Sequence, residues 1–222
     1  MNPLINQISE CIEQGKVNLA AAYPPQMKGL PGADELTRQA LDEGVDPNDI
    51  LNKALVNAMN RVGQKFAENK IFVPQMLLAA KAMSASMAHL KPFFQSGEVK
   101  RKGVMVMGTV TGDLHDIGKN LCCMMVEGAG WEVIDLGVDV KPEQFLAELD
   151  RHPHAFVGLS ALLTTTMVNM GVIINAIREK YPNTKIAVGG APVNNEFALS
   201  IGANGYGKDP QELITWLDKN VA

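Results

Sequence analysis

In the middle of the chain a histidine and two aspartates lie within four residues of sequence, a spacing that suits metal binding or general-base catalysis. Residues 103–120 read GVMVMGTVTGDLHDIGKN, so Asp113 precedes His115 by two residues and Asp116 follows it directly. A carboxylate that hydrogen-bonds an imidazole fixes its tautomer and raises its basicity, which suits a metal ligand or a general base. This stretch is therefore the first candidate site.

The residues around this histidine have the pattern of a strand, a polar turn and a helix. Residues 104–107 are an apolar run typical of a strand buried on both faces. Residues 117–126 favour a helix, which Gly128 and Gly130 end. This order places the polar turn at the carboxyl edge of a parallel sheet, where open α/β folds bind their ligands.

The same alternation continues to the end of the chain. Further strands are predicted at 132–135, 155–159, 185–188 and 205–206, and further helices at 142–150, 166–180, 194–201 and 210–219. Five strand–helix units predict an α/β fold, an open, mostly parallel, five-stranded sheet of the flavodoxin-like (Rossmann-like) kind.

The first part of the chain has a different pattern, with apolar residues at helical spacing. Helices are predicted at 2–15, 34–42, 47–62 and 76–94, which together predict a four-helix bundle. The polar segment 96–102 is predicted to be a linker. We therefore expect a helical domain at 1–95, a linker at 96–102 and an α/β domain at 103–222.

Composition restricts the kind of protein. The chain has 222 residues, of which 46% are hydrophobic, and this is typical of a globular protein. A net charge of -4 favours neither nucleic acid nor an anionic membrane as a partner. No apolar run approaches the roughly 18 residues that span a bilayer, and the N-terminus does not resemble a signal peptide. With three cysteines, two of them adjacent, we expect reduced thiols and a cytoplasmic protein.

Two other groups of residues follow predicted strands. Ser160, Leu162, Thr164 and Thr166 come after the third strand, and the Gly189–Gly190 pair comes after the fourth. Taken alone, each group has an ordinary structural explanation, because hydroxyls cap helices and glycines turn the chain. At adjacent strand ends they are also placed to surround one elongated ligand.

Two common kinds of site are not predicted. The segment from Gly112 to Lys119 resembles a phosphate-binding loop, but it has five residues between its glycines and Asn120 where such loops have Ser or Thr. Zinc needs three or four clustered ligands. The Cys122–Cys123 pair falls within a predicted helix and the two histidines at 152 and 154 in a different loop, so both pairs are interpreted as structural.

The combined pattern Asp113-x-His115-x-x-Gly118, Ser160-x-Leu162 and Gly189-Gly190 resembles the fingerprint of cobalamin-binding domains. The resemblance implies a cobalamin whose nucleotide tail has left the cobalt, with His115 as the lower metal ligand and Asp113 hydrogen-bonded to its ring. Thr166 stands where cobalamin-dependent methionine synthase has the serine of a relay with the histidine and the aspartate. The implied cofactor-binding residues are Gly112, Asp113, Leu114, His115, Asp116, Gly118, Ser160, Leu162, Thr164, Gly189 and Gly190.

The helical part also carries a resemblance. Residues 66–76, FAENKIFVPQM, and 79–83, AAKAM, are similar to the helical cap of methionine synthase and of small corrinoid proteins that serve methanol and methylamine methyltransferases. The resemblance implies that Phe66, Val73 and Met76 lie near the methyl group on the cobalt. A place in the bundle core explains the same residues equally well.

The family implies a function. We expect a methyl carrier that works with separate donor and acceptor methyltransferases, the acceptor being tetrahydrofolate or a thiol, and with a reductive activase. Such a chain is a component of a methyltransferase system, and whether it counts as an enzyme is left open. A cobalamin-binding regulator is the alternative, and the small subunit of an adenosylcobalamin mutase is a third. Such regulators usually carry a DNA-binding head, and an N-terminus that is short and not basic disfavours the regulator; the helical part disfavours the mutase subunit.

Overall fold

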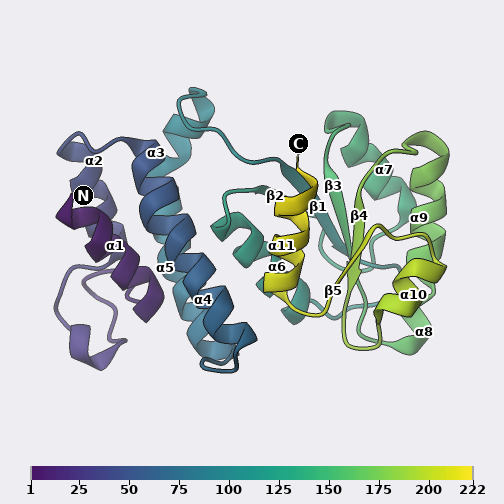
Figure 1. The fold of residues 1–222 in the computed structure, drawn as a ribbon, viewed down its shortest axis with the longest axis horizontal. Helices are drawn as coiled ribbons and strands as arrows, with labels where there is room; N and C mark the ends of the chain where they lie inside the picture. The colour runs from purple at the N-terminus through teal and green to yellow at the C-terminus, as the bar shows by residue number, and fades with distance from the viewer. Residues whose placement is uncertain (1, 222) are drawn as a thin grey trace. The chain divides into compact units, whose positions relative to one another are not determined.

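The computed structural model describes residues 2–221, which divide into two compact units. The first unit runs to Arg101 and includes Gly128–Gly130, and the second contains Lys102–Glu127 and the chain from Trp131 onward (Figure 1). The first is helical and the second is a parallel sheet with helices, so the predicted fold class is confirmed. The domain limits 1–95, 96–102 and 103–222 stay predictions.

The first unit contains the predicted bundle. Its helices are α1 (Pro3–Gln14), α2 (Ala33–Asp42), α3 (Pro47–Asp49), which continues through the π-helical segment η2 (Ile50–Val56) into α4 (Asn57–Ala67), and α5 (Val73–Gln95); a short 3₁₀ turn, η1 (Pro25–Met27), lies between α1 and α2. Side chains cap two helix starts: Asn2 accepts the Leu4 N–H, and Asp46 accepts the Asn48 N–H.

The apolar stripes predicted from the sequence form the core of the bundle. The largest fully buried apolar side chains of this unit are Ile8, Ile12, Ile50, Leu51, Leu55, Met59, Met76, Met83 and Leu90. One polar contact lies among them: the Thr37 hydroxyl donates to Ser86 Oγ at 2.9 Å, and Ser86 donates to the Ala33 carbonyl at 3.2 Å. Because both hydroxyls are buried and satisfied, they fix α2 against α5.

The second unit contains the predicted parallel sheet. Its strands are β1 (Val104–Thr109), β2 (Glu132–Asp135), β3 (Phe156–Ser160), β4 (Ile186–Gly189) and β5 (Gly205–Gly207), in the order β2-β1-β3-β4-β5. Its helices are α6 (Ile117–Gly128), α7 (Pro142–Arg151), α8 (Thr164–Met167), α9 (Asn169–Lys180), α10 (Asn195–Ser200) and α11 (Pro210–Asn220). Figure 1 shows α6 and α11 on one face of the sheet and α7 and α9 on the other.

Two elements of this unit differ from the sequence prediction. Strand β1 continues beyond residue 107 to Thr109, which pairs with Ser160 of β3. The helix expected over 166–180 begins at Thr164 and is divided at Val168 into α8 and α9. Side chains account for the division: Thr166 in α8 is bound to Asp113, whereas Asn169 in α9 donates to the Thr111 carbonyl at 2.7 Å.

Apolar residues on both faces hold the sheet in place. On the α7 and α9 face, Val106, Val157 and Val188 of the strands meet Phe145, Leu149 and Ile173 of the helices. Elsewhere Phe156 packs edge-on against Trp131, with ring centroids 5.2 Å apart, and against Trp216, at 5.7 Å. These contacts make the sheet a rigid support for the loops at its ends.

In the part of the chain that the structure describes, no helix combines the length and the apolar character that crossing a membrane requires.

Two leucines of the second unit give a matched test of this core. Leu149 is 0% exposed, whereas Leu199 is 68% exposed. We expect Leu149→Ala to lower the free energy of unfolding by about 2–5 kcal/mol, because it leaves a cavity, and Leu199→Ala to change it by no more than about 0.5 kcal/mol. Urea denaturation followed by circular dichroism measures both, and equal losses would contradict the packing described above.

Candidate functional site

The candidate site lies at the carboxyl edge of the sheet, between β1 and β3. After β1 the chain crosses to β2 on one side, and after β3 it crosses to β4 on the other side. The loops that follow β1 and β3 therefore diverge and leave a crevice between them. The structure brings Asp113, from the loop after β1, into contact with Leu162 and Thr166, from the segment after β3. Sequence-predicted site residues from two separate segments therefore meet here.

The carboxylate of Asp113 is the centre of the site and is fully buried. Its Oδ2 accepts hydrogen bonds from the Thr166 hydroxyl at 2.6 Å and from the backbone N–H groups of Leu162 at 2.8 Å and Leu163 at 3.4 Å. Its Oδ1 lies 3.0 Å from the backbone N of His115 and 2.8 Å from the ring Nδ1 of the same residue. One carboxylate thus joins the two loops.

These hydrogen bonds decide the charge of Asp113. Burial by itself would raise its pKa, but the hydrogen bonds from Thr166, from the Leu162 N–H and from His115 outweigh it and hold the pKa of Asp113 well below its ordinary value. The group is therefore a carboxylate at neutral pH, which only accepts hydrogen bonds. It follows that Nδ1 of His115 carries the proton and that Nε2 keeps its lone pair in the neutral ring.

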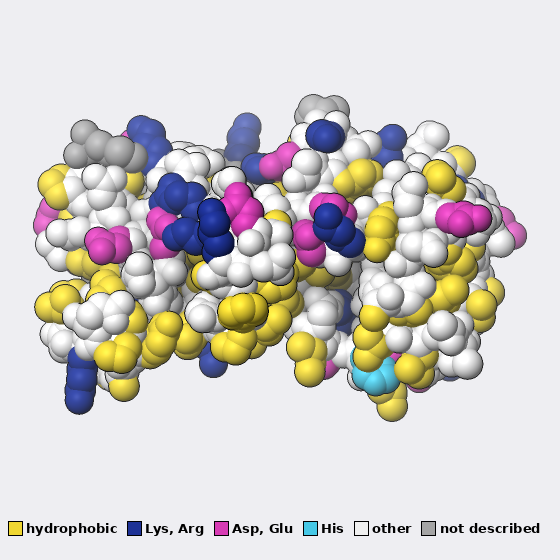
Figure 2. Space-filling model, turned by 60° about the horizontal axis from the view of Figure 1, so that its bottom comes forward, with side chains coloured by type: hydrophobic (Ala, Val, Ile, Leu, Met, Phe, Trp, Pro, Cys, Tyr) yellow, Lys and Arg dark blue, Asp and Glu magenta, His cyan; other side chains and the backbone are white. Residues whose placement is uncertain are grey.

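His115 presents this second nitrogen outward. Its side chain is 51% exposed, and within residues 2–221 no protein group hydrogen-bonds to Nε2. Large apolar side chains on both loops are exposed as well, namely Leu114, Ile117, Leu162 and Leu163. Figure 2 shows hydrophobic side chains beside a histidine on the face drawn there. An open imidazole nitrogen on an apolar surface suits a large, flat, metal-containing ligand.

Three further contacts hold the loop after β1, and the sequence analysis did not identify them. The Thr109 hydroxyl donates to the His115 carbonyl at 2.9 Å. Asp139 accepts the Gly112 N–H at 2.7 Å and donates its own N–H to the Asp113 carbonyl at 3.0 Å. Asp139 has a φ of 52° and Gly112 a φ of 82°, so both are in the left-handed region that the tight turn requires. The only sequence signal for these contacts was Thr109, a threonine that follows the apolar run of the predicted strand.

The start of α6 is held by an ion pair between a buried lysine and a partly exposed aspartate. Lys119 is 1% exposed at its side chain, and its ammonium donates to Asp135 at the end of β2, at 2.5 and 2.6 Å, and to Asn120 Oδ1 at 2.6 Å. Asn120 also donates to the carboxylate of Asp116 at 3.0 Å, while Gly118 faces open space. Lys119 therefore holds the start of α6 against the end of β2.

Glycines shape the neighbouring strand ends. A Cβ on Gly190 would lie 1.8 Å from the Ala161 carbonyl oxygen, and a Cβ on Gly189 would lie 2.9 Å from that of Gly207. Ser160 ends β3 in register with Thr109 and Gly189, and Thr164 begins α8. The close approach of these backbones leaves no space for side chains at the Gly189–Gly190 turn. The slot for a cobalamin tail that the resemblance implies at this edge, and each residue's contact with the cofactor, stay predictions.

The other predicted cofactor residues belong to the first unit. Met76 is fully buried, Phe66 is half-buried and Val73 is exposed. Met76 is therefore a core residue in this structure. The predicted place of all three beside the methyl group stays a prediction.

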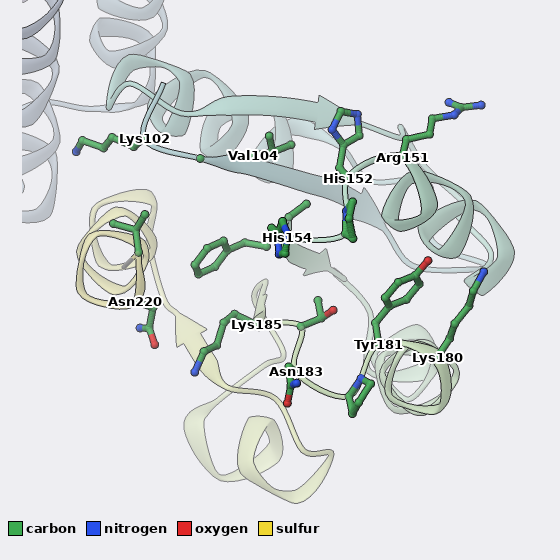
Figure 3. A pocket seen from close by; sticks show the side chains of 17 residues that line it. Lys102, Val104, Arg151, His152, His154, Lys180, Tyr181, Asn183, Lys185 and Asn220 are labelled. Atoms are coloured by element: carbon green, nitrogen blue, oxygen red, sulfur yellow. The ribbon is translucent and has the colours of Figure 1, made fainter. Parts of the chain in front are cut away.

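A second hollow, of 890 Å³, lies at the opposite, amino edge of the sheet (Figure 3). Cationic side chains line it, but several are paired: Lys102 lies 2.9 Å from Asp218, Arg151 2.8 Å from Glu148, and Lys180 2.5 Å from Asp150. Arg151 and Lys180 also stand in the last turns of α7 and α9, where cations offset the helix dipole. These charges therefore have a structural explanation.

The remaining titratable candidates are unsuited to metal binding or nucleophilic chemistry. His152 and His154 both line the amino-edge hollow, and within the described residues no group of three or more His, Cys, Asp or Glu is placed to hold a metal ion. Cys11, Cys122 and Cys123 are free thiols. Burial raises the pKa of Cys11 to about 11 and those of Cys122 and Cys123 to about 12, so they stay protonated at neutral pH.

The role of the Asp113 charge is testable by its pH dependence. We expect Asp113→Asn to lower the stability of the cofactor-free protein at pH 7 by about 1–3 kcal/mol, because buried donors lose an ionised acceptor. Since the pKa of Asp113 is lower in the folded than in the unfolded protein, its contribution is present above about pH 4 and is lost as the pH falls further. Urea denaturation at pH 7 and pH 3 should show the gap to wild type narrowing in acid.

Asp150→Asn is the matched control, because this carboxylate accepts hydrogen bonds from Lys180 and Tyr181 on the surface. We expect that variant to unfold almost like wild type at both pH values. A gap between Asp113→Asn and wild type that is the same at pH 7 and pH 3 would contradict the assigned charge.

The close approach at Gly190 gives a second test. Gly190→Ala adds a Cβ that collides with a carbonyl oxygen at a φ of 124°, whereas Gly202→Ala has a φ of 76° and nothing within 4 Å. We expect Gly202→Ala to cost about 1–2 kcal/mol of stability from backbone strain alone, and Gly190→Ala to cost more than about 3 kcal/mol. Thermal unfolding compares the two, and equal costs would show that the turn at Gly190 has room for a side chain.

Comparison with known proteins agrees with this geometry. A family model described as a B12 binding domain matches residues 103–214, and a second model of the same description matches residues 31–91. A corrinoid protein of Desulfitobacterium hafniense is 37% identical over 190 residues, covering 83% of this chain and 88% of the relative. Trimethylamine corrinoid protein 1 of Methanosarcina acetivorans is 36% identical over 187 residues, covering 82% and 87%.

A solved structure is similar over nearly the whole chain. It is that of the methanol:cobalamin methyltransferase complex of Methanosarcina barkeri, with a TM-score of 0.82 and 29% identity, covering 99% of this chain and 80% of that one. The resemblance found in the sequence is thereby confirmed for both parts of the chain. The chain belongs to the family of corrinoid proteins with a B12 binding domain.

Proposed function

We propose that this chain carries a methyl group on the cobalt of a bound corrinoid, which one methyltransferase loads and another unloads. The observation that carries this proposal is the His115 imidazole, whose Nδ1 is bound to a buried carboxylate while its Nε2 faces outward. Membership of the corrinoid-protein family supports it, and so do relatives named for trimethylamine and dimethylamine. No observation favours the regulator or the mutase subunit.

In this proposal His115 is the lower ligand of the cobalt. When bound, the corrinoid supplies a metal centre that accepts and gives up a methyl group. The protein supplies a ligand of fixed orientation: Asp113 keeps the proton on Nδ1, so Nε2 is available to the metal. The residues placed to receive the nucleotide tail are Ser160, Leu162, Thr164, Gly189 and Gly190, and those around the ligand are Gly112, Leu114, Asp116 and Gly118.

Asp113 and Thr166 have a further role in proton balance. A proton at Nε2 would make the ring a cation, which the adjacent Asp113 carboxylate would stabilise. The Thr166 hydroxyl donates to the same carboxylate at 2.6 Å, so it limits the negative charge that the imidazole feels. Threonine thereby provides the hydroxyl contact that the resemblance implies for a serine at this position.

The proposed partners follow from the carrier role, in which other proteins load and unload the methyl group. Two separate methyltransferases are proposed, and the acceptor is tetrahydrofolate or a thiol compound. A reductive activase is a further proposed partner, because a cofactor that works in a reduced state is open to oxidation. We also propose that the protein acts in the cytoplasm, on the basis of its three free cysteines.

His115→Ala tests the proposed ligand, and His152→Ala, in the loop at the other edge of the sheet, is its matched control. We expect wild type and both variants to bind cobalamin, since the tail slot is unchanged. Only His115→Ala should lose the visible spectrum of a histidine-ligated corrinoid, and its methyl transfer from methyl iodide to an acceptor methyltransferase should fall at least about 10-fold.

The two parts of the proposal fail separately. Full methyl transfer by His115→Ala would remove His115 as the working ligand. A wild-type protein that binds no cobalamin in equilibrium dialysis would overturn the corrinoid function itself.

A further inference from the structure

We infer that Thr109 is a positioning residue that holds His115 in place for the metal; this rests on the proposed function of His115. Thr109 is the last residue of β1, and its side chain is fully buried. Its hydroxyl donates to the backbone carbonyl of His115 at 2.9 Å. No described residue other than Asp113 and Thr109 hydrogen-bonds to His115.

The contact matters because the segment that carries His115 has no regular secondary structure. Residues 111–116 belong to neither β1 nor α6. The first backbone acceptor of α6 is the Asp116 carbonyl, which accepts from the Asn120 N–H at 2.7 Å. The His115 carbonyl therefore lies just before the helix and takes no part in its hydrogen bonds. Its only protein donor among the described residues is the Thr109 hydroxyl.

Three hydrogen bonds with two fully buried residues thus hold the half-exposed His115. Asp113 binds the backbone N–H and the ring of His115, and Thr109 binds its carbonyl. If Asp113 were its only partner, His115 could pivot, because its backbone N–H and its ring Nδ1 both bind the same carboxylate oxygen. The bond from Thr109 attaches the other end of the residue to the sheet. Because β1 is paired on both sides, this end has little freedom to move.

Removal of this hydroxyl has a local effect, because the strand holds Thr109 by its backbone. The Thr109 N–H donates to the Gly137 carbonyl at 3.0 Å, and its carbonyl accepts the Val140 N–H at 2.9 Å. Thr109→Val keeps both contacts and the shape of the side chain and removes only the donor. We expect the ligated arrangement of His115 to become less favourable by about fivefold, the value of one typical net hydrogen bond.

The experiment measures ligand strength by competition with cyanide. The full-length protein is loaded with cyanocobalamin and titrated with cyanide at fixed pH, and the change to the dicyano spectrum reports displacement of the lower ligand. We expect Thr109→Val to reach its midpoint at about fivefold lower cyanide than wild type. Thr109→Ser keeps the hydroxyl and should titrate like wild type.

Thr111→Val is the matched control, because it makes the same chemical change on the same loop. The Thr111 hydroxyl donates to the Val140 carbonyl at 2.8 Å and does not contact His115, so its midpoint should equal that of wild type. Should Thr109→Val fail to fold, Thr109→Ala removes the same hydroxyl in a smaller side chain. An unchanged midpoint in the hydroxyl-free variant, or an equal shift in Thr109→Ser or Thr111→Val, would overturn the role of Thr109.

A separate spectrum distinguishes this failure from failure of the proposed function. Electron paramagnetic resonance of the cobalamin-loaded wild type in the paramagnetic cobalt(II) state, with its histidines labelled with nitrogen-15, shows the splitting of that isotope when an imidazole binds the cobalt, and His115→Ala lacks it. If wild type binds cobalamin but shows no such splitting, His115 is not the ligand and the role of Thr109 falls with it, whereas the corrinoid function itself fails only if cobalamin does not bind. If the splitting is present and the cyanide midpoints are all equal, only the role of Thr109 is overturned.

Discussion

The site depends on one buried charge, the carboxylate of Asp113. A carboxylate removed from water is stable only when its oxygens accept hydrogen bonds from several donors. Here the donors are the backbone N–H of Leu162, the Thr166 hydroxyl, and the backbone and ring of His115. They come from the two loops that follow β1 and β3, so satisfying this one charge assembles both sides of the crevice.

The site combines rigid, buried supporting residues with an accessible imidazole. Asp113 and Thr109 are fully buried, whereas the His115 side chain is 51% exposed. Each oxygen and nitrogen that orients the imidazole therefore belongs to the packed sheet or its first turn, while Nε2 faces outward. An imidazole held in this way would lose less conformational freedom on binding a metal than a freely rotating surface histidine.

The two edges of the sheet differ because all its strands are parallel. Apart from the short α8, the helices of the second unit lead from the end of one strand back toward the amino edge. The C-termini of α7 and α9 therefore lie at that edge, where Arg151 and Lys180 offset their dipoles. The carboxyl edge instead has loops of mixed composition, with exposed leucines and the Gly189–Gly190 turn. The polarity of the sheet thus places the candidate site at one edge and compensated cations at the other.

The sequence by itself determined the kind of fold, nearly all helices and strands, and the residues that define the family. Apolar periodicity predicted the bundle and the five strands, and the resemblance of the motif with Asp113, His115 and Gly118 to cobalamin-binding domains implied the corrinoid. These features are local, because neighbouring residues set each pattern. Tertiary structure alone decided that β1 reaches Thr109, that α8 and α9 separate at Val168, and that Asp139 supports the Gly112 turn. Such contacts join residues that are distant in the chain, and many of them use backbone groups that every residue has. The type of residue at a position therefore does not predict them.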